Sequence, residues 1–168
     1  MKNSKTFEIE YKGEIYDAEW FEGGDFEKAN IHGVAGFIFD KKGKLCMVRV
    51  GKKRGWTLPG GGVEKCDKTP EDAFIRETQE EADLDLKNIK RLGYWKSFPR
   101  KNPKDIAYTG RFVAEVKKIK PQTIDPAEGV IPERVFINPK DFNKYTNWKA
   151  NGEFQLKKAL KLLKQKKK

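Results

Sequence analysis

Residues 58–84 read LPGGGVEKCDKTPEDAFIRETQEEADL, and this stretch joins a glycine-rich turn to an acidic helix. Thr69 is a suitable helix N-cap, and Pro70 stands at the first helical position, where proline is favoured. The two acidic residues that follow suit the positive end of a helix dipole. We expect the helix to run to about Ala82, although Asp83 stands where glycine commonly ends a helix.

Three glutamates share one face of this predicted helix. Glu77, Glu80 and Glu81 stand at positions i, i+3 and i+4, so their carboxylates lie close together and repel one another. Arg76, four residues before Glu80, can hold that side chain by a charge-assisted hydrogen bond. A hard divalent cation can offset the remaining repulsion, because Mg²⁺ prefers carboxylate and water oxygens. The pattern therefore predicts a magnesium site, with Mn²⁺ as the alternative ion.

The glycines at 60–62 directly follow Pro59 and let the backbone turn sharply and approach a ligand. A free carbonyl in this turn can complete a metal shell, and free amides can meet phosphate oxygens, so Gly61 is a candidate substrate contact. Carboxylates on a helix that faces such a turn favour a site for a metal-bound polyphosphate. The alternative is an acidic, solvated helix face beside an ordinary loop.

The segment 61–84 resembles the signature of the Nudix hydrolases, and residues 56–61 match the W-x-L-P-G-G lead-in of that family. Counted forward from Gly61, Asp67 takes the first acidic position of the signature, and Lys68 is then a one-residue insertion. Counted back from Arg76, Lys68 itself takes that position. Asp83 replaces the closing glycine, which requires a left-handed or altered turn that Asp tolerates better than most residues.

This resemblance implies a fold and an activity. The fold is an α+β, Nudix-type α/β/α sandwich with a mixed sheet, and the activity is Mg²⁺-dependent hydrolysis of a nucleoside diphosphate linked to another group. The resemblance makes Glu77, Glu80 and Glu81 metal ligands and the carbonyl of Gly60 a further ligand. It also makes Arg76 the residue that positions the glutamates.

The general base and the substrate contacts are less narrowly defined by the resemblance. Glu81, Glu128 and Glu133 are candidates for the base, and the last two are equally well explained as solvated carboxylates. Candidate phosphate contacts are Arg49, Lys52, Lys53 and Arg54, and candidate base-stacking residues are Trp56, Trp95, Phe98 and Tyr108. The alternatives are a solvated loop for the basic run and core packing for the aromatics, and we favour core packing for Trp56.

The rest of the chain predicts one domain around this segment. We divide it into an N-terminal hairpin extension (1–29), a sandwich core (30–146) and a C-terminal basic amphipathic helix with a lysine-rich tail (153–168). The hairpin is expected within 7–20, strands at 34–39, 45–50, 56–58, 89–96, 106–116 and 134–137, and a helical turn at 141–145. A last helix over 153–164 places Leu156, Ala159, Leu160 and Leu163 on one stripe, which should pack on the body.

The net charge of +11 arises mostly at the C-terminus. Residues 157–168 contain seven lysines and no acids, which leaves 29 basic against 25 acidic residues in the remainder. Clustered lysines attract RNA, DNA or anionic lipid without reading sequence. We favour the simpler interpretation of a solvated end, since no arginine or aromatic residue interrupts the run.

Several classes of protein are excluded or disfavoured. The longest apolar stretch, residues 34–39, is far shorter than the roughly 20 residues of a membrane span, and the N-terminus lacks the apolar region of a secretory signal. Two cysteines without a CxxC motif and a single histidine argue against a disulfide framework or a zinc site. We therefore expect a cytoplasmic protein without a membrane partner.

The substrate is expected to be a small nucleotide, first of all ADP-ribose or a similar nucleoside diphosphate derivative. Pro99 lies 15 residues beyond Leu84, as in some ADP-ribose pyrophosphatases. The N-terminal hairpin resembles the same branch, where it assists dimerisation, so a homodimer is expected. The alternatives are a nucleoside triphosphate pyrophosphatase, an RNA 5′-end pyrophosphohydrolase aided by the lysine tail, and a non-catalytic nucleotide-binding module.

Overall fold

The computed structural model describes residues 4–165. Its strands are β1 (Lys5–Tyr11), β2 (Glu14–Glu22), β3 (Gly33–Phe39), β4 (Leu45–Arg49), β5 (Gly60–Gly62), β6 (Leu84–Pro99), β7 (Ala107–Ile119) and β8 (Glu133–Ile137). Its helices are α1 (Pro70–Ala82), a 3₁₀ turn (Pro139–Asp141), α2 (Phe142–Thr146) and α3 (Lys149–Lys164).

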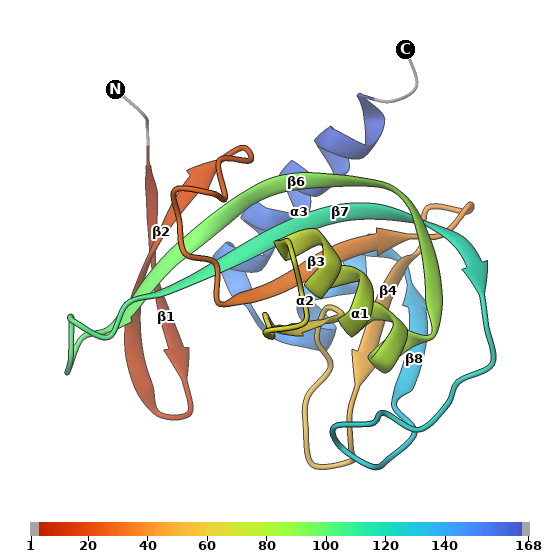
Figure 1. Ribbon diagram of the computed structural model, residues 1–168. Coiled ribbons are helices and arrows are strands. Elements are labelled where there is room, and N and C mark those ends of the chain that lie inside the picture. Colours follow the sequence, from red (N-terminus) through yellow and green to blue (C-terminus); the bar gives the residue numbers. More distant parts are fainter. Residues whose placement is uncertain (1–3, 166–168) are drawn as a thin grey trace.

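Within these residues the strands form one mixed sheet in the order β1-β2-β6-β7-β3-β4-β8, with β5 added beside β3. Only the β3–β7 pairing is parallel among the described strand pairs. Helix α1 covers one face of the sheet, and α2 and α3 lie on the other (Figure 1). The expected α/β/α sandwich is therefore confirmed.

Each face of the sheet has its own apolar core. On the α1 face, Phe74 of the helix stacks on Phe112 of β7 at 4.9 Å between ring centroids. Gly36 of β3 makes this possible, because a Cβ there would collide with the ring of Phe74. On the α3 face, Trp20 and Trp95 are almost fully buried and meet Phe154 of α3.

The predicted N-terminal hairpin is present and extends the sheet, since β2 pairs with β6 along its length. The last helix also packs as expected: Ala159 is fully buried, and Leu156, Leu160 and Leu163 pack against the same core. It begins at Lys149, four residues earlier than predicted. The final three lysines of the tail lie outside the described residues.

Two predicted elements need correction. The strand expected at 56–58 is only a single bridge between Thr57 and Val48, and the following glycines form β5 instead. Strand β6 begins at Leu84 and not at 89, so the chain enters the sheet directly after α1.

No helix within residues 4–165 has both the length and the apolar character that crossing a bilayer requires.

Candidate active site

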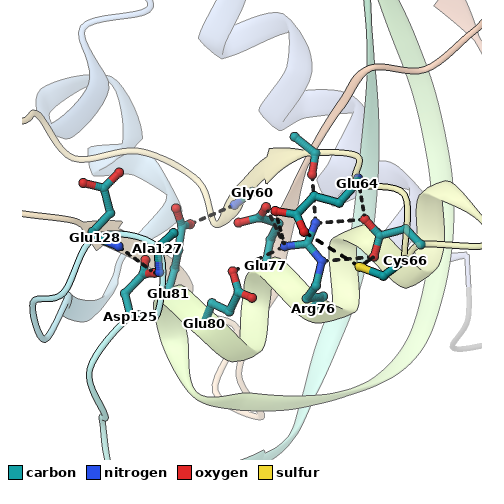
Figure 2. A network of polar contacts seen from close by, with 12 residues as sticks. Gly60, Glu64, Cys66, Arg76, Glu77, Glu80, Glu81, Asp125, Ala127 and Glu128 are labelled. Carbon is teal, nitrogen blue, oxygen red and sulfur yellow. Dashed lines mark hydrogen bonds and ion pairs between the residues drawn. The ribbon is translucent and has the colours of Figure 1, made fainter.

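Arg76 is the centre of a polar network between α1 and the loop that precedes it. Its Nη1 donates to Glu77 Oε1 at 3.0 Å and to Glu80 Oε2 at 3.3 Å, as the spacing on the helix predicted for Glu80. Its Nη2 donates to the carbonyl of Gly62 at 2.9 Å. Figure 2 shows Glu77 and Glu80 beside Arg76 on the helix. The pKa of the guanidinium is held well above its usual value, chiefly by its bond to Asp67 and then by Glu77.

The acidic position of the loop belongs to Asp67 and not to Lys68. Both Asp67 oxygens accept from Arg76, at 3.0 and 2.9 Å, and the carboxylate is almost fully buried. The guanidinium lowers the pKa of Asp67, so this carboxylate stays ionised. Lys68 is accommodated just before the helix, where Thr69 and Asp72 form a reciprocal capping box on either side of Pro70.

The glycines let two glutamates lie against the backbone of β5. A Cβ at Gly61 would overlap the carboxylate of Glu77, so any other residue there would require that side chain to move. The amide of Gly60 donates to Glu81 Oε2 at 3.0 Å. Because β5 is paired with β3, these contacts tie the helix to the centre of the sheet.

Glu81 is the most strongly perturbed acid of the site. Burial raises its pKa to about 8, an effect that the Gly60 amide only partly opposes. The negative charges of Glu77, Asp125 and Glu80 contribute to the same rise. Burial also raises the pKa of Glu77, despite its bond to Arg76. The face of α1 thus carries more negative charge than its protein surroundings balance.

Asp125 joins this group from the loop between β7 and β8, and sequence reasoning missed it. The residue is 3% exposed, and its Oδ1 accepts from the amides of Ala127 and Glu128 at 2.8 and 3.3 Å. An Asp-Pro pair favours turn initiation, which was the one local signal for this turn. Its proximity to Glu81 comes from the fold.

The oxygen donors of this site suit a hard divalent cation. Glu77, Glu80 and Glu81 offer carboxylates, and clustered acids with a raised pKa are stabilised by a cation of this kind. In the structure, these carboxylates accept hydrogen bonds from Arg76 and from the Gly60 amide. Within residues 4–165, no three acidic, histidine or cysteine side chains lie close enough together to bind a metal ion. Ligation therefore requires the glutamates to exchange these partners for the ion.

Of the predicted basic contacts, the two arginines each pair with an acid. Arg54 pairs with Glu128 at 3.1 Å. Arg49 donates to both oxygens of Glu133, at 2.9 and 2.8 Å, and lies over the ring of Trp56 at 4.8 Å. Both alternative candidates for the general base are therefore engaged by arginines.

The aromatic candidates are spread out. Trp56 is partly buried against the α3-side core and makes an edge contact with Tyr145. Trp95 belongs to that core. Phe98 lies at the far end of β6, opposite Asp17 of β2, so the structure does not bring it to the glutamates.

Asp83 both ends α1 and anchors the loop between β7 and β8. It adopts the left-handed conformation expected of it (φ 49°, ψ 49°). Its carboxylate accepts from the amide and the hydroxyl of Thr123, at 2.8 and 3.0 Å. A glycine could not make these bonds, which anchor the loop that carries Asp125.

Comparison with known proteins matches the chain to one protein family. The family model described as NUDIX domain matches residues 29–157. An RNA pyrophosphohydrolase of Marinomonas sp. (strain MWYL1) is 36% identical over 56 residues, which span 33% of this chain and only 34% of that protein.

Two solved structures extend the comparison to the whole fold. A Bacillus subtilis pyrophosphohydrolase superposes with a TM-score of 0.72 at 19% identity, over 92% of this chain and 96% of its own. An ADP-ribose pyrophosphatase of Streptococcus suis 89-1591 superposes with a TM-score of 0.52 at 22% identity, over 77% and 89%. At these identities the superpositions show a shared fold.

Proposed function

Because the chain belongs to the NUDIX domain family, we propose that it is an enzyme that hydrolyses a pyrophosphate bond in a nucleotide with a divalent cation. The observation that carries this proposal is the partly buried Glu81, with its raised pKa, beside Glu77 and Glu80 on one face of α1. A solvated acidic surface would not raise the pKa of a carboxyl in this way.

We assign the cation to Glu77, Glu80 and Glu81. A divalent ion held by these residues would neutralise charge on the diphosphate and make a water molecule more acidic. When Glu81 exchanges the Gly60 amide for the ion, its second carboxylate oxygen is left to take a proton from water. Arg76 links the glutamates to Asp67 and Gly62, and so fixes the loop against the helix.

We place the substrate at the 5′ end of RNA ahead of ADP-ribose, which reverses the order that the sequence favoured. The curated relative described above is named as an RNA pyrophosphohydrolase. The cue for ADP-ribose is weakened, because Pro99 lies at the far end of β6, opposite Tyr16. ADP-ribose remains the second candidate, since a protein of that named activity shares the fold.

Product identification tests the activity and the substrate together. The purified chain is incubated with 5′-triphosphate RNA, ADP-ribose and nucleoside triphosphates, with and without Mg²⁺, and the products are separated by chromatography. Pyrophosphate or phosphate released from RNA supports the first candidate, and AMP with ribose phosphate supports the second. Nucleotide binding without any cleavage would leave the non-catalytic module as the function.

A matched pair of variants tests the site itself. Glu80→Gln should lower Mg²⁺-dependent turnover about 100-fold or more, since it removes a charge from the cation site. Glu153→Gln makes the same change at an exposed position of α3 and should leave turnover unchanged. Equal activity of the two variants would refute the assignment to α1.

Three finer assignments rest on the same proposal. We propose Mg²⁺ as the working ion, with Mn²⁺ as a substitute, which parallel titrations of turnover would rank. The homodimer and the cytoplasmic location stay predictions, and sedimentation of the purified chain tests the first of them.

A further inference from the structure

Arg111 carries a positive charge without a counter-ion in the middle of the sheet. It lies on β7 and faces α3, where its Nε donates to Gln155 Oε1 at 2.9 Å and its Nη1 to the carbonyl of Gly110 at 3.3 Å. Arginines 49, 54, 76, 91 and 100 all pair with carboxylates. In the part of the chain that the structure describes, no carboxylate pairs with Arg111.

Its surroundings leave this charge uncompensated. Desolvation lowers the pKa of Arg111 to about 10, so the guanidinium remains protonated at neutral pH in a place that disfavours its charge. A partly desolvated cation of this kind gains most from an anion or a carbonyl oxygen brought by a ligand.

The orientation of Arg111 is fixed from α3. Gln155 is 1% exposed, and its Nε2 donates to Asn151 Oδ1 at 2.6 Å, which points its Oε1 at Arg111. The guanidinium is therefore held in place by a neutral partner, and its charge remains available.

The sheet beside Arg111 is partly exposed to solvent. Gly33, Ala35 and Thr109 are partly exposed, like Arg111 itself, whereas Phe37, further along β3 on the same face, is fully buried. Small residues on central strands thus leave a surface that α3 does not cover.

This surface lies on the α3 face of the sheet, and the strand register connects it through β5 to the proposed cation site of α1. Arg111 pairs with Ala35 in the parallel register, and Ala35 pairs with Gly60 of β5. The Gly60 amide in turn binds Glu81. Two strand spacings amount to about 10 Å, a gap that an extended arginine and a nucleotide can bridge together.

We propose that Arg111, oriented by Gln155, binds an oxygen of the nucleotide substrate, either a phosphate oxygen or a base carbonyl, on the strip of sheet between β7 and Gly60. Arg111 is then a substrate-binding residue and Gln155 a positioning residue. The proposal rests on the proposed function, because it places the substrate across β3 from the glutamates of α1.

Binding measurements without metal test this assignment independently of turnover. Calorimetry in EDTA compares GTP, inorganic pyrophosphate and guanosine as probes for the wild type, Arg111→Met, Arg111→Lys and Gln155→Glu. Arg100→Met is the matched control, since Arg100 is half exposed and pairs with Asp17 on the hairpin. Arg111→Met should weaken GTP binding about 10- to 100-fold, the range of a charged hydrogen bond, and Arg111→Lys less.

Gln155→Glu separates binding from a structural role. The new carboxylate cannot donate to Asn151 Oδ1, but the charge pair that it forms with Arg111 should offset this loss. We therefore expect α3 to stay docked and the melting temperature to be preserved, while the charge of Arg111 is neutralised. Weaker GTP binding at an unchanged melting temperature supports the proposal, even if Arg111→Met fails to fold. Wild-type affinity in both Gln155→Glu and Arg111→Lys would overturn it.

The probes identify the oxygen that is bound. A loss confined to GTP and pyrophosphate assigns a phosphate to Arg111, and a loss shared by guanosine assigns the base carbonyl. If the wild type binds GTP but cleaves no substrate with Mg²⁺, the proposed function fails while this comparison still decides the role of Arg111.

Discussion

Glu81 makes the stability of the protein depend on pH, because its carboxyl is far easier to protonate in the folded protein than in the unfolded chain. Its pKa rises from the ordinary 4.5 to about 8, chiefly through burial. Between these values the native state holds a proton that the unfolded chain has lost. We therefore expect the metal-free protein to lose stability as pH rises from 5 to 8.5, by up to a few kcal/mol.

Urea unfolding in EDTA at a series of pH values measures this loss. Glu81→Gln keeps an acceptor for the Gly60 amide but cannot ionise, so its stability should vary much less over the same range. Mg²⁺ should restore stability most at high pH, where Glu81 is charged. A wild-type curve that stays flat between pH 5 and 8.5 would contradict the assigned environment of Glu81.

Asp67 and Lys68 are neighbours with opposite expected importance. Asp67 accepts two bonds from Arg76 in a nearly closed environment, so Asp67→Asn should cost about 1–3 kcal/mol of unfolding free energy. It should also lower turnover, because Arg76 holds Glu77 and Glu80.

Lys68→Ala is the control for this change. The lysine is exposed just before the helix cap, so its loss should stay within about 0.5 kcal/mol. Chemical denaturation of both variants decides between the two alignments of the loop. A larger effect at Lys68 than at Asp67 would reinstate the alignment that the structure rejects.

Helix α1 is joined to the loop between β7 and β8 through Asp83. Asp83→Ala removes two bonds to Thr123 and places alanine at φ 49°, so we expect a loss of about 2–4 kcal/mol. Asp83→Asn tolerates the same backbone and keeps one acceptor, so its loss should be about half as large. Thermal unfolding ranks the variants.

Turnover supplies the second readout for this connection. Since the anchored loop carries Asp125 beside Glu81, Asp83→Ala should reduce activity more than a helix end alone would explain. Unchanged turnover in a folded Asp83→Ala variant would show that the loop keeps its place without this anchor.

The elements that the sequence predicted well are those with local signals. The bounds of α1 follow from Thr69, Pro70 and the spacing of its glutamates, and the structure has the same start and end. Strand β5 was missed because its three glycines show no side-chain pattern; its pairing with β3 defines it. The first four residues of β6, Leu84 to Lys87, do alternate between apolar and polar, but the pattern breaks at Asn88, where the pairing with β7 is irregular. The strand was therefore expected to begin only after this break.

The features of the site also divide into those that a local sequence pattern predicted and those that it did not. The bond from Arg76 to Glu80 follows from helix geometry and was predicted. The burial of Glu81, the approach of Asp125 and the isolation of Arg111 depend on residues far apart in the chain. No local pattern encodes these features, and they determine the electrostatics of the site.

At the scale of the whole molecule, α3 connects the N-terminal hairpin to the centre of the sheet. Phe154 meets Phe7 of β1 and Trp20 of β2, and Lys158 pairs with Glu22 at 2.7 Å. Gln155, which directly follows Phe154 in α3, accepts a hydrogen bond from Arg111 of β7. The hairpin therefore stabilises the helix that orients the proposed substrate-binding arginine.

Phe154→Ala tests this connection. It removes a ring that is partly exposed but has three aromatic neighbours, so we expect a loss of about 2 kcal/mol, below that of a fully buried phenylalanine. Amide hydrogen exchange should accelerate in β1, β2 and α3 and stay slow in α1, which packs on the opposite face of the sheet. Phe154→Leu retains apolar volume and should recover most of the stability.

The kinetics of Phe154→Ala show whether α3 only supports the fold or also positions Arg111. If α3 sets the position of Arg111, Phe154→Ala should raise the KM for the nucleotide while kcat, which depends on the α1 glutamates, changes little. An equal fall in kcat would mean that disturbance on the α3 face reaches α1 through the sheet. An unchanged KM together with faster exchange in α3 would show that Arg111 keeps its place on β7 without the helix.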